Sequence, residues 1–213
     1  MSDKSHSSKS KINLPNKLTV LRICLVPVFM VIMMLPSEFL SLTVSGIVGG
    51  VLFIIASLTD MLDGKIARKY HLITDFGKLM DPLADKFMVI GALTALVYRC
   101  TDNQRLFFII VLLVVVFREL AVTSLRLVAS SSGGQVVAAN MLGKIKTVTQ
   151  IAFVVVAIAE PIVYSIPAVA YILPFDSTIL PLAYALGAAT VVMTLWSGIN
   201  YFVSLWKYLD PQK

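Results

Sequence analysis

The chain has 213 residues, of which 58% are hydrophobic and only 14% are charged, and its formal net charge is +6. Because roughly a quarter of the residues in a soluble domain are charged, this composition excludes an ordinary soluble protein and indicates an integral membrane protein. The positive charge does not indicate binding to nucleic acid, since the basic residues stand at the ends of apolar segments without interleaved aromatic residues.

The N-terminal arm, residues 1–12, is polar and rich in serine, which predicts a disordered arm or an appended tag. Residues 13–213 contain apolar segments without an internal repeat, so we expect one all-α membrane domain with six transmembrane helices. A spanning helix needs about 17–25 residues, so the third and fifth segments should extend into flanking polar residues. The six segments are Leu18–Leu35, Ser41–Thr59, Pro82–Val97, Leu106–Leu125, Val148–Tyr164 and Leu182–Leu205.

The lysines and arginines predict the orientation of these helices. Six spans place both termini on one side of the membrane, and all lysines and arginines except Arg99 and Arg105 belong to that side. Because basic residues favour the cytoplasmic side, both termini are expected in the cytoplasm. The chain is therefore expected to be a multi-pass protein of the cell membrane that contacts membrane lipids and their anionic headgroups.

The first two apolar segments carry polar and small residues at helical spacing. Asn16, Thr19 and Arg22 can share one helix face, where they either contact a bound ligand or anchor the helix at the membrane interface. Gly46 and Gly50, in the stretch "GIVGG", are separated by three residues. This spacing indicates close packing of the second helix against a neighbouring helix rather than catalysis.

Acidic residues recur at helical spacing in the stretch "TDMLDGKIARKYHLITDFGKLMDPLAD", which joins the second and third apolar segments. Asp60 and Asp63 would share one helix face, and Asp81 and Asp85 would share another. The link between these helices is short, so we expect the two acidic faces to lie opposite each other. Asp75 lies off the second face, and we interpret it as a solvated loop acid or a helix N-cap. Carboxylates at a membrane edge are costly, so the facing acids need compensating partners.

Two divalent cations would neutralise four neighbouring carboxylates, which otherwise repel one another. Oxygen ligands without histidine or cysteine favour Mg²⁺, Mn²⁺ or Ca²⁺ over zinc. Gly64 and Ala67 follow the first acidic pair and lack bulk, so a ligand could approach the backbone there. Arg68 could pair with a phosphate. The alternative is a solvated helix end whose acids form ordinary salt bridges with nearby lysines and arginines.

Basic residues mark the same predicted side of the fourth and fifth segments. Arg118 and Glu119 interrupt the fourth apolar run, so Arg118 is expected to face a polar cavity, whereas Arg126 could extend to the interface. Adjacent residues on a helix point in different directions, so we do not expect Arg118 and Glu119 to neutralise each other. Lys144 and Lys146 are either topology signals or cations beside a substrate. If several of these basic residues converge, they form a receptor for a substrate phosphate.

The acidic pattern as a whole is D-x2-D-G-x2-A-R-x8-G-x3-D-x3-D, and it resembles the signature of the CDP-alcohol phosphotransferases without a departure. The eight matching residues are Asp60, Asp63, Gly64, Ala67, Arg68, Gly77, Asp81 and Asp85. The resemblance implies a six-helix membrane enzyme, usually a homodimer, which moves a substituted phosphate from a CDP-alcohol to an acceptor alcohol and releases CMP.

The same resemblance implies roles for these residues. The four aspartates would bind two divalent cations, Mg²⁺ or Mn²⁺, and Asp85 would also act as the catalytic base. The remaining implied role is a nucleotide pocket. By resemblance its members are Asp63, Gly64, Ala67 and Arg68, and we expect Gly77, Asn16 and Thr19 as further contacts of the nucleotide.

Three shorter stretches, "NLPNKLTVLRI", "FRELAVTSLR" and "GKIKT", resemble the subfamily that makes phosphatidylglycerophosphate. This likeness implies CDP-diacylglycerol as donor and sn-glycerol 3-phosphate as acceptor. The expected receptor for the acceptor phosphate consists of Arg118, Arg126, Lys144 and Lys146. Two alternatives stay open, namely another acceptor, such as inositol phosphate or a different headgroup alcohol, and a divalent-cation transporter. The transporter is disfavoured because the acids cluster at one membrane edge rather than along a pathway.

Overall fold

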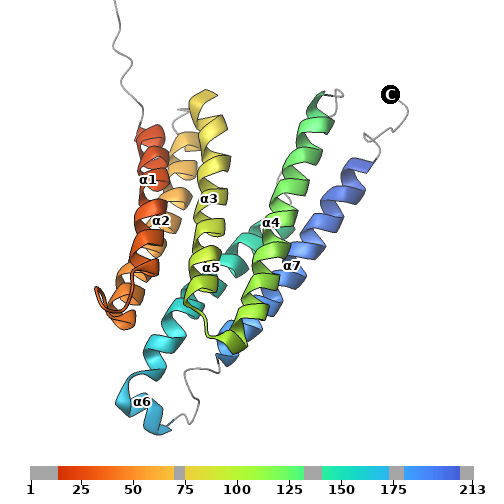
Figure 1. The fold of residues 1–213 in the computed structure, drawn as a ribbon. Helices are drawn as coiled ribbons and strands as arrows, with labels where there is room; N and C mark the ends of the chain where they lie inside the picture. Colours follow the sequence, from red (N-terminus) through yellow and green to blue (C-terminus); the bar gives the residue numbers. More distant parts are fainter. Residues whose placement is uncertain (1–13, 70–74, 132–140, 173–179, 207–213) are drawn as a thin grey trace, which may run out of the picture.

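The computed structural model describes residues 14–69, 75–131, 141–172 and 180–206, so the predicted N-terminal arm lies outside the described residues. Every regular element in these ranges is a helix (Figure 1), which confirms the predicted all-α class. The helices are α1 (Leu14–Met34), α2 (Leu42–Lys69), α3 (Asp75–Arg99), α4 (Asp102–Ser131), α5 (Met141–Tyr164), α6 (Pro167–Ile172) and α7 (Pro181–Leu205).

Each predicted apolar segment lies in one of the long helices, apart from Leu35 and Ser41, which stand one residue outside α1 and α2. Several helices extend well beyond their apolar parts. Helix α2 continues past Thr59 to Lys69 and therefore contains the first half of the acidic motif. Helix α3 begins at Asp75 and α5 at Met141, so the two short segments do extend into polar flanks as expected. The short helix α6 was not predicted.

Five of the described helices, α1, α2, α4, α5 and α7, are long and apolar enough to cross a membrane. By length and composition of these helices, the prediction of a multi-pass membrane protein is therefore confirmed. Helix α3 is long enough, with 25 residues, but it is not among these five. Its apolar part is bounded by charged residues, with Asp85 and Lys86 on one side and Arg99 on the other.

The long helices form two groups of three. Helix α1 packs against α2 and α3, and α7 packs against α4 and α5. Contacts of α3 with α4 and α5, and of α2 with α5, join the two groups (Figure 1). The start of α1 and the end of α7 lie at the same end of the bundle, as an even number of crossings requires.

Glycines allow the closest approaches between helices. A Cβ atom added at Gly46 would lie 2.8 Å from the Cδ1 atom of Ile162, and one added at Gly50 would lie 3.5 Å from the Cγ2 atom of Ile158. Both neighbours belong to α5, so the predicted packing role of the "GIVGG" stretch on α2 is confirmed. Gly187 of α7 faces the rings of Phe107 and Phe153 in the same way.

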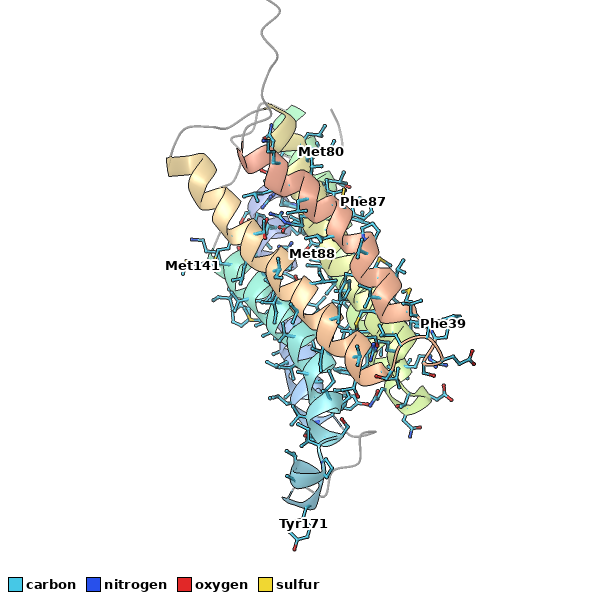
Figure 2. All side chains as sticks on the ribbon, turned by 90° about the vertical axis from the view of Figure 1, so that its left-hand side faces the viewer. Phe39, Met80, Phe87, Met88, Met141 and Tyr171 are labelled. Carbon is cyan, nitrogen blue, oxygen red and sulfur yellow. The ribbon has the colours of Figure 1, made fainter. Side chains whose placement is uncertain are left out.

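The outside of the bundle is largely apolar, as a surface that faces lipid must be. Neighbouring residues of α3 illustrate the division: Phe87 is 55% exposed and projects outward, whereas Met88 is 3% exposed and lies inside the bundle (Figure 2). Leu79 and Leu83 are also exposed on α3. Helix α3 thus presents apolar side chains on its outer face even though its first turns carry acids.

We predict that Gly187→Ala destabilises the protein. The added methyl group would stand 2.7 Å from the Phe107 ring and 2.9 Å from the ring of Phe153, which is completely buried and has little room to move. Overpacking of this kind costs about 1–3 kcal/mol. The expected result is a lower melting temperature in detergent.

Gly50→Ala is the matched control, because its methyl group would make only an ordinary contact, at 3.5 Å from Ile158. Alanine is favoured over glycine inside a helix by up to about 1 kcal/mol, so this variant should be at least as stable as the parent. Equal melting temperatures for the two variants would contradict the close packing of α7.

Candidate active site

A cavity of about 400 Å³ lies where the two helix groups meet. Asp60 of α2 lines it, together with residues of α3, α4 and α5. The cavity therefore collects polar side chains from helices that are far apart in the sequence. The charged and amide side chains around it are Asp60, Asp85, Lys86, Arg118, Glu119, Arg126, Lys146 and Gln150.

Helix α1 holds the acidic helices α2 and α3 through two polar contacts. The Nη1 atom of Arg22 lies 2.5 Å from the Oδ1 atom of Asp60, and the Arg22 side chain is fully buried. The Oγ1 atom of Thr19 donates a hydrogen bond of 2.6 Å to Asp81. Asn16 is also buried. The expected shared face of Asn16, Thr19 and Arg22 is thus confirmed, and two of these residues contact acids of the motif.

The aspartates of the motif are only partly brought together in the described part of the chain. Asp60 and Asp85 line the same cavity from two helices, whereas Asp81 is exposed and does not line it. The side chain of Asp63 lies outside the described residues. Among the side chains that are described, no three acidic, histidine or cysteine residues form a group that could hold a metal ion.

Most of the expected nucleotide-binding residues can be placed only by their backbone. Asp63, Gly64, Ala67 and Arg68 all belong to the unbroken helix α2, but their side chains lie outside the described residues. Because Asp63 follows Asp60 by three helical residues, the two positions lie on neighbouring turns of one helix face. Gly77 is buried in the first turn of α3.

Carboxylate oxygens supplied by two helices are the donor set that a hard divalent cation prefers. Asp60 and Asp85 present two such groups to one cavity. Asp63 lies about one turn from Asp60 on α2, and Asp81 lies about one turn from Asp85 on α3. The residues present therefore fit a divalent cation by donor type and by helix position.

Arg118 faces the cavity, as expected from its place in an apolar run. Its Nη2 atom donates a 2.7 Å hydrogen bond to Ser197, and its guanidinium lies 5.6 Å from the centre of the Tyr201 ring. Gly198 leaves room for this side chain, since a Cβ atom there would lie 3.2 Å from the Cγ atom of Arg118. All three neighbours belong to α7, which thus fixes the position of Arg118.

The expectation that Arg118 and Glu119 do not pair is wrong. The Nη1 atom of Arg118 lies 3.1 Å from the Oε1 atom of Glu119, and Lys146 of α5 bonds the same oxygen. Long flexible side chains can bend toward a common cavity even from adjacent helix positions, and the lysine from a second helix draws the carboxylate inward. All three side chains are at least 86% buried.

Arg126 and Lys144 lie differently from Lys146. Arg126 is exposed but lines the cavity, and its Nη2 atom donates a 2.8 Å hydrogen bond to the hydroxyl of Tyr201. Lys144 is exposed and does not line the cavity. Two residues along a helix point to different sides, which explains why only Lys146 faces inward. Three of the four expected phosphate-binding cations therefore converge.

Several polar residues of the bundle were not singled out from the sequence. Gln150 lines the cavity one turn after Lys146, and its position within an apolar helix is a signal that could have revealed it. Lys86 of α3 donates a 2.6 Å hydrogen bond to Thr123 of α4, and both residues line the cavity. Glu160 is buried near the other end of α5, where it accepts hydrogen bonds from the backbone of Leu182 and Ala183 at the start of α7.

The cavity has an acidic wall and a basic wall. Asp60 and Asp85, together with Lys86, face it from α2 and α3, whereas Arg118, Arg126 and Lys146 face it from α4 and α5. Glu119 supplies one negative charge for two neighbouring cations, so the basic wall keeps an excess of positive charge. This arrangement suits a polar anionic ligand next to a carboxylate that can accept a proton.

Comparison with known proteins gives consistent matches over most of the chain. A family model described as CDP-alcohol phosphatidyltransferase matches residues 12–196. The CDP-diacylglycerol--glycerol-3-phosphate 3-phosphatidyltransferase of Bacillus subtilis (strain 168) is 43% identical over 204 residues, covering 92% of this chain and 97% of the relative. A relative of the same name from Pseudomonas fluorescens is 33% identical over 202 residues, with 92% of each chain covered. The resemblance drawn from the acidic motif is confirmed.

We predict that Glu119→Gln destabilises the protein, because it leaves Arg118 and Lys146 buried without a carboxylate. Removing one partner of a buried ion pair costs about 3–5 kcal/mol. The expected result is a clear fall in the melting temperature in detergent. Removing the Lys146 charge as well, in Glu119→Gln/Lys146→Met, should restore part of the loss.

Asp102→Asn is the control for this change, because Asp102 also pairs with an arginine, Arg105, but is 88% exposed. An exposed pair contributes only about 0–1 kcal/mol. If both carboxylate-to-amide changes lower the melting temperature equally, Glu119 is not the centre of a buried network.

Proposed function

Because the chain belongs to the CDP-alcohol phosphatidyltransferase family, we propose that it transfers the phosphatidyl group of CDP-diacylglycerol to sn-glycerol 3-phosphate. The products are phosphatidylglycerophosphate and CMP. The observation that carries the proposal is the cavity in which Asp60 and Asp85 stand opposite Arg118 and Lys146. The relatives from Bacillus subtilis and Pseudomonas fluorescens, whose names state this activity, support the choice of both substrates.

The four aspartates of the motif, Asp60, Asp63, Asp81 and Asp85, would hold two divalent cations, Mg²⁺ or Mn²⁺. Their oxygen donors and their positions on α2 and α3 support this role. Such ions, when bound, neutralise the pyrophosphate and the charge that develops on the transferred phosphorus. The Arg22 guanidinium neutralises part of the charge of Asp60 and fixes its carboxylate.

Asp85 is the proposed base. It is half-buried on the cavity wall, where a neutral alcohol can approach it. In the proposed step, Asp85 takes the proton of an acceptor hydroxyl, and the acceptor oxygen forms a bond to the phosphorus attached to diacylglycerol. The bond between that phosphorus and the bridging oxygen of the pyrophosphate breaks, and CMP leaves with the electron pair.

The nucleotide would lie along α2 and the start of α3. Asp63, Gly64, Ala67, Arg68 and Gly77 are the proposed contacts. Their supporting feature is the position of all five on two packed helices of the motif. Asn16 and Thr19 of α1 are proposed to complete this pocket, with Thr19 also holding Asp81 through its hydroxyl.

The phosphate of the acceptor would bind the basic wall of the cavity. Arg118, Arg126 and Lys146 are the proposed ligands, and the excess of positive charge over Glu119 supports an anionic acceptor. A guanidinium suits phosphate because it donates two parallel hydrogen bonds. Lys144, exposed in the first turn of α5, would attract the same anion at the edge of the site.

We propose α3 as the sixth membrane span, with both termini and the active site facing the cytoplasm. Its length of 25 residues and its exposed apolar side chains Leu79, Leu83 and Phe87 support the crossing. The common end of the bundle at which α1 starts and α7 ends supports an even number of spans. The excess of lysine and arginine on that side supports the orientation. A homodimer is proposed from the family resemblance.

The distribution of charge does not favour a cation transporter. A permeation pathway needs acidic groups along its length. The second cavity, of about 320 Å³, lies where α3 ends and α2 begins, and the described residues that line it include Arg99 but no acid. The cavity at that end therefore has no acidic side chain among its described lining residues that would continue the acidic cluster.

We expect Asp60→Asn, Asp81→Asn and Asp85→Asn each to abolish release of CMP from CDP-diacylglycerol and sn-glycerol 3-phosphate. Each change removes a carboxylate proposed to bind cations, and the last also removes the base. Excess EDTA should abolish the activity of the parent protein, and added Mg²⁺ or Mn²⁺ should restore it. Asp102→Asn, at the other end of the bundle, should keep the parent rate. Full activity in EDTA would contradict the cation-dependent mechanism.

We expect Arg118→Ala to raise the KM for sn-glycerol 3-phosphate at least tenfold, equivalent to about 1.4 kcal/mol of binding. The KM for CDP-diacylglycerol should change less than twofold, because Arg118 stands on the wall opposite Asp60 and the nucleotide motif. Equal weakening of both substrates would assign Arg118 a structural role.

The acceptor itself is tested by measuring CMP release from the wild-type protein with a panel of alcohols. The panel contains sn-glycerol 3-phosphate, inositol phosphate, serine and free glycerol. Faster release with any of the other three would overturn the proposed acceptor while leaving the reaction class intact.

A further inference from the structure

Gln150 carries a buried donor that no group in the described part of the chain satisfies. Its side chain is 2% exposed, it lines the proposed active-site cavity, and its Nε2 atom has no hydrogen-bond partner there. A buried donor without a partner costs about 1–3 kcal/mol, and folded proteins contain few of them. A ligand in the cavity would remove this cost.

A second unsatisfied donor faces the same cavity. The Nε atom of Arg118 is buried and also lacks a partner among the described residues, although both Nη atoms of this arginine are bonded. Helix α4 runs toward the end of the bundle at which α3 begins, and α5 runs away from it (Figure 1). Arg118 is therefore deeper than Arg126 on α4, and Gln150 is deeper than Lys146 on α5. The two donors belong to the inner part of the cavity.

The Nε2 atom of Gln150 and the Nε atom of Arg118, with Lys146 beside them, indicate which kind of ligand could accept their hydrogen bonds. An apolar group would leave both hydrogens unsatisfied, and a cation would be repelled by Arg118 and Lys146. A phosphate monoester offers several oxygen acceptors on one tetrahedral group, so it can accept from an amide, a guanidinium and an ammonium at the same time. The amide adds a hydrogen bond without adding a third buried positive charge.

We propose that Gln150 binds the phosphate of the acceptor, with its Nε2 atom donating to one phosphate oxygen while Nε of Arg118 donates to another. This inference rests on the proposed function, because it concerns the same acceptor. Gln150 thereby sets how deep the phosphate lies in the cavity, and so where the acceptor hydroxyl stands relative to Asp85. The role of Gln150 is to bind and position the acceptor, and the proton transfer is left to Asp85.

The test compares Gln150→Leu with Gln104→Leu. Leucine keeps most of the side-chain volume and removes the donor. Gln104 is also buried, at 3% exposure, but it lines the cavity at the opposite end, where its Oε1 atom accepts a hydrogen bond from the backbone of Thr101. We expect Gln150→Leu to raise the KM for sn-glycerol 3-phosphate at least fivefold and to change the KM for CDP-diacylglycerol less than twofold. Gln104→Leu should change neither.

A second measurement needs no turnover. Ligand that binds only the folded state raises the melting temperature by mass action. Adding sn-glycerol 3-phosphate should raise the melting temperature of the wild-type protein in detergent more than that of Gln150→Leu. Without ligand, Gln150→Leu should be at least as stable as wild type, because the variant lacks an unsatisfied donor. Gln104→Leu should be less stable, because it loses a hydrogen bond.

The analogue 3-hydroxypropyl phosphate, which has no hydroxyl on the middle carbon, separates phosphate binding from hydroxyl binding. If Gln150 binds the phosphate, Gln150→Leu raises the KM for both acceptors by the same factor. If the factor falls to one with the analogue, Gln150 contacts the middle hydroxyl and the proposal is overturned. An unchanged KM, or equal weakening of donor and acceptor, also overturns it.

The same data separate this inference from the proposed function. If the wild-type protein releases CMP with sn-glycerol 3-phosphate and Gln150→Leu binds it normally, only the role of Gln150 fails. If the wild-type protein uses only acceptors without a phosphate, the proposed function fails, and the role of Gln150 fails with it.

Discussion

The ion pair between Arg22 and Asp60 is the contact on which the rest of the site depends. A fully buried guanidinium in an apolar bundle is stable only beside a negative group, so α1 can pack in its place only if α2 brings Asp60 to it. The hydrogen bond from Thr19 to Asp81 fixes α3 against the same face of α1. Helix α1 thus sets the relative register of the two helices that carry the acidic motif.

The same requirement for charge compensation organises the opposite wall of the cavity. Glu119 is a single carboxylate that receives both Arg118 and Lys146, so it joins α4 to α5 across the space between them. One carboxylate for two cations holds the wall together and still leaves positive charge for a substrate. The fold and the chemistry of the site therefore follow from one constraint, which is that buried charges need compensating partners, and Arg22 and Lys146 have theirs on another helix.

The sequence predicts the helices well because long apolar runs have few alternatives in a membrane. Hydropathy alone does not give the full lengths of α2 and α3, because their motif-bearing ends are polar, but the helical spacing of the acids indicates that both helices continue into the motif. Arg118 could be assigned to a cavity because a charge within an apolar run needs a polar environment. Its pairing with Glu119 could not, since that contact depends on Lys146 from a helix distant in the sequence. The hydrogen bonds of Glu160 and the cavity beside Gln150 could not be predicted for the same reason, although the place of Gln150 in an apolar helix marks it as a candidate.

Helix α7 contributes no side chain to the walls of the cavity. Nevertheless Ser197 accepts a hydrogen bond from Arg118, Tyr201 accepts one from Arg126, and Gly198 leaves the space in which the Arg118 stem lies. The outward side of this helix is apolar, with Val192, Trp196 and Val203 exposed. A lipid tail or an apolar inhibitor that displaces α7 from outside would therefore move both arginines together. Such a compound would act on the anion-binding wall without entering the cavity, and it would leave the acidic wall, held by α1, in place.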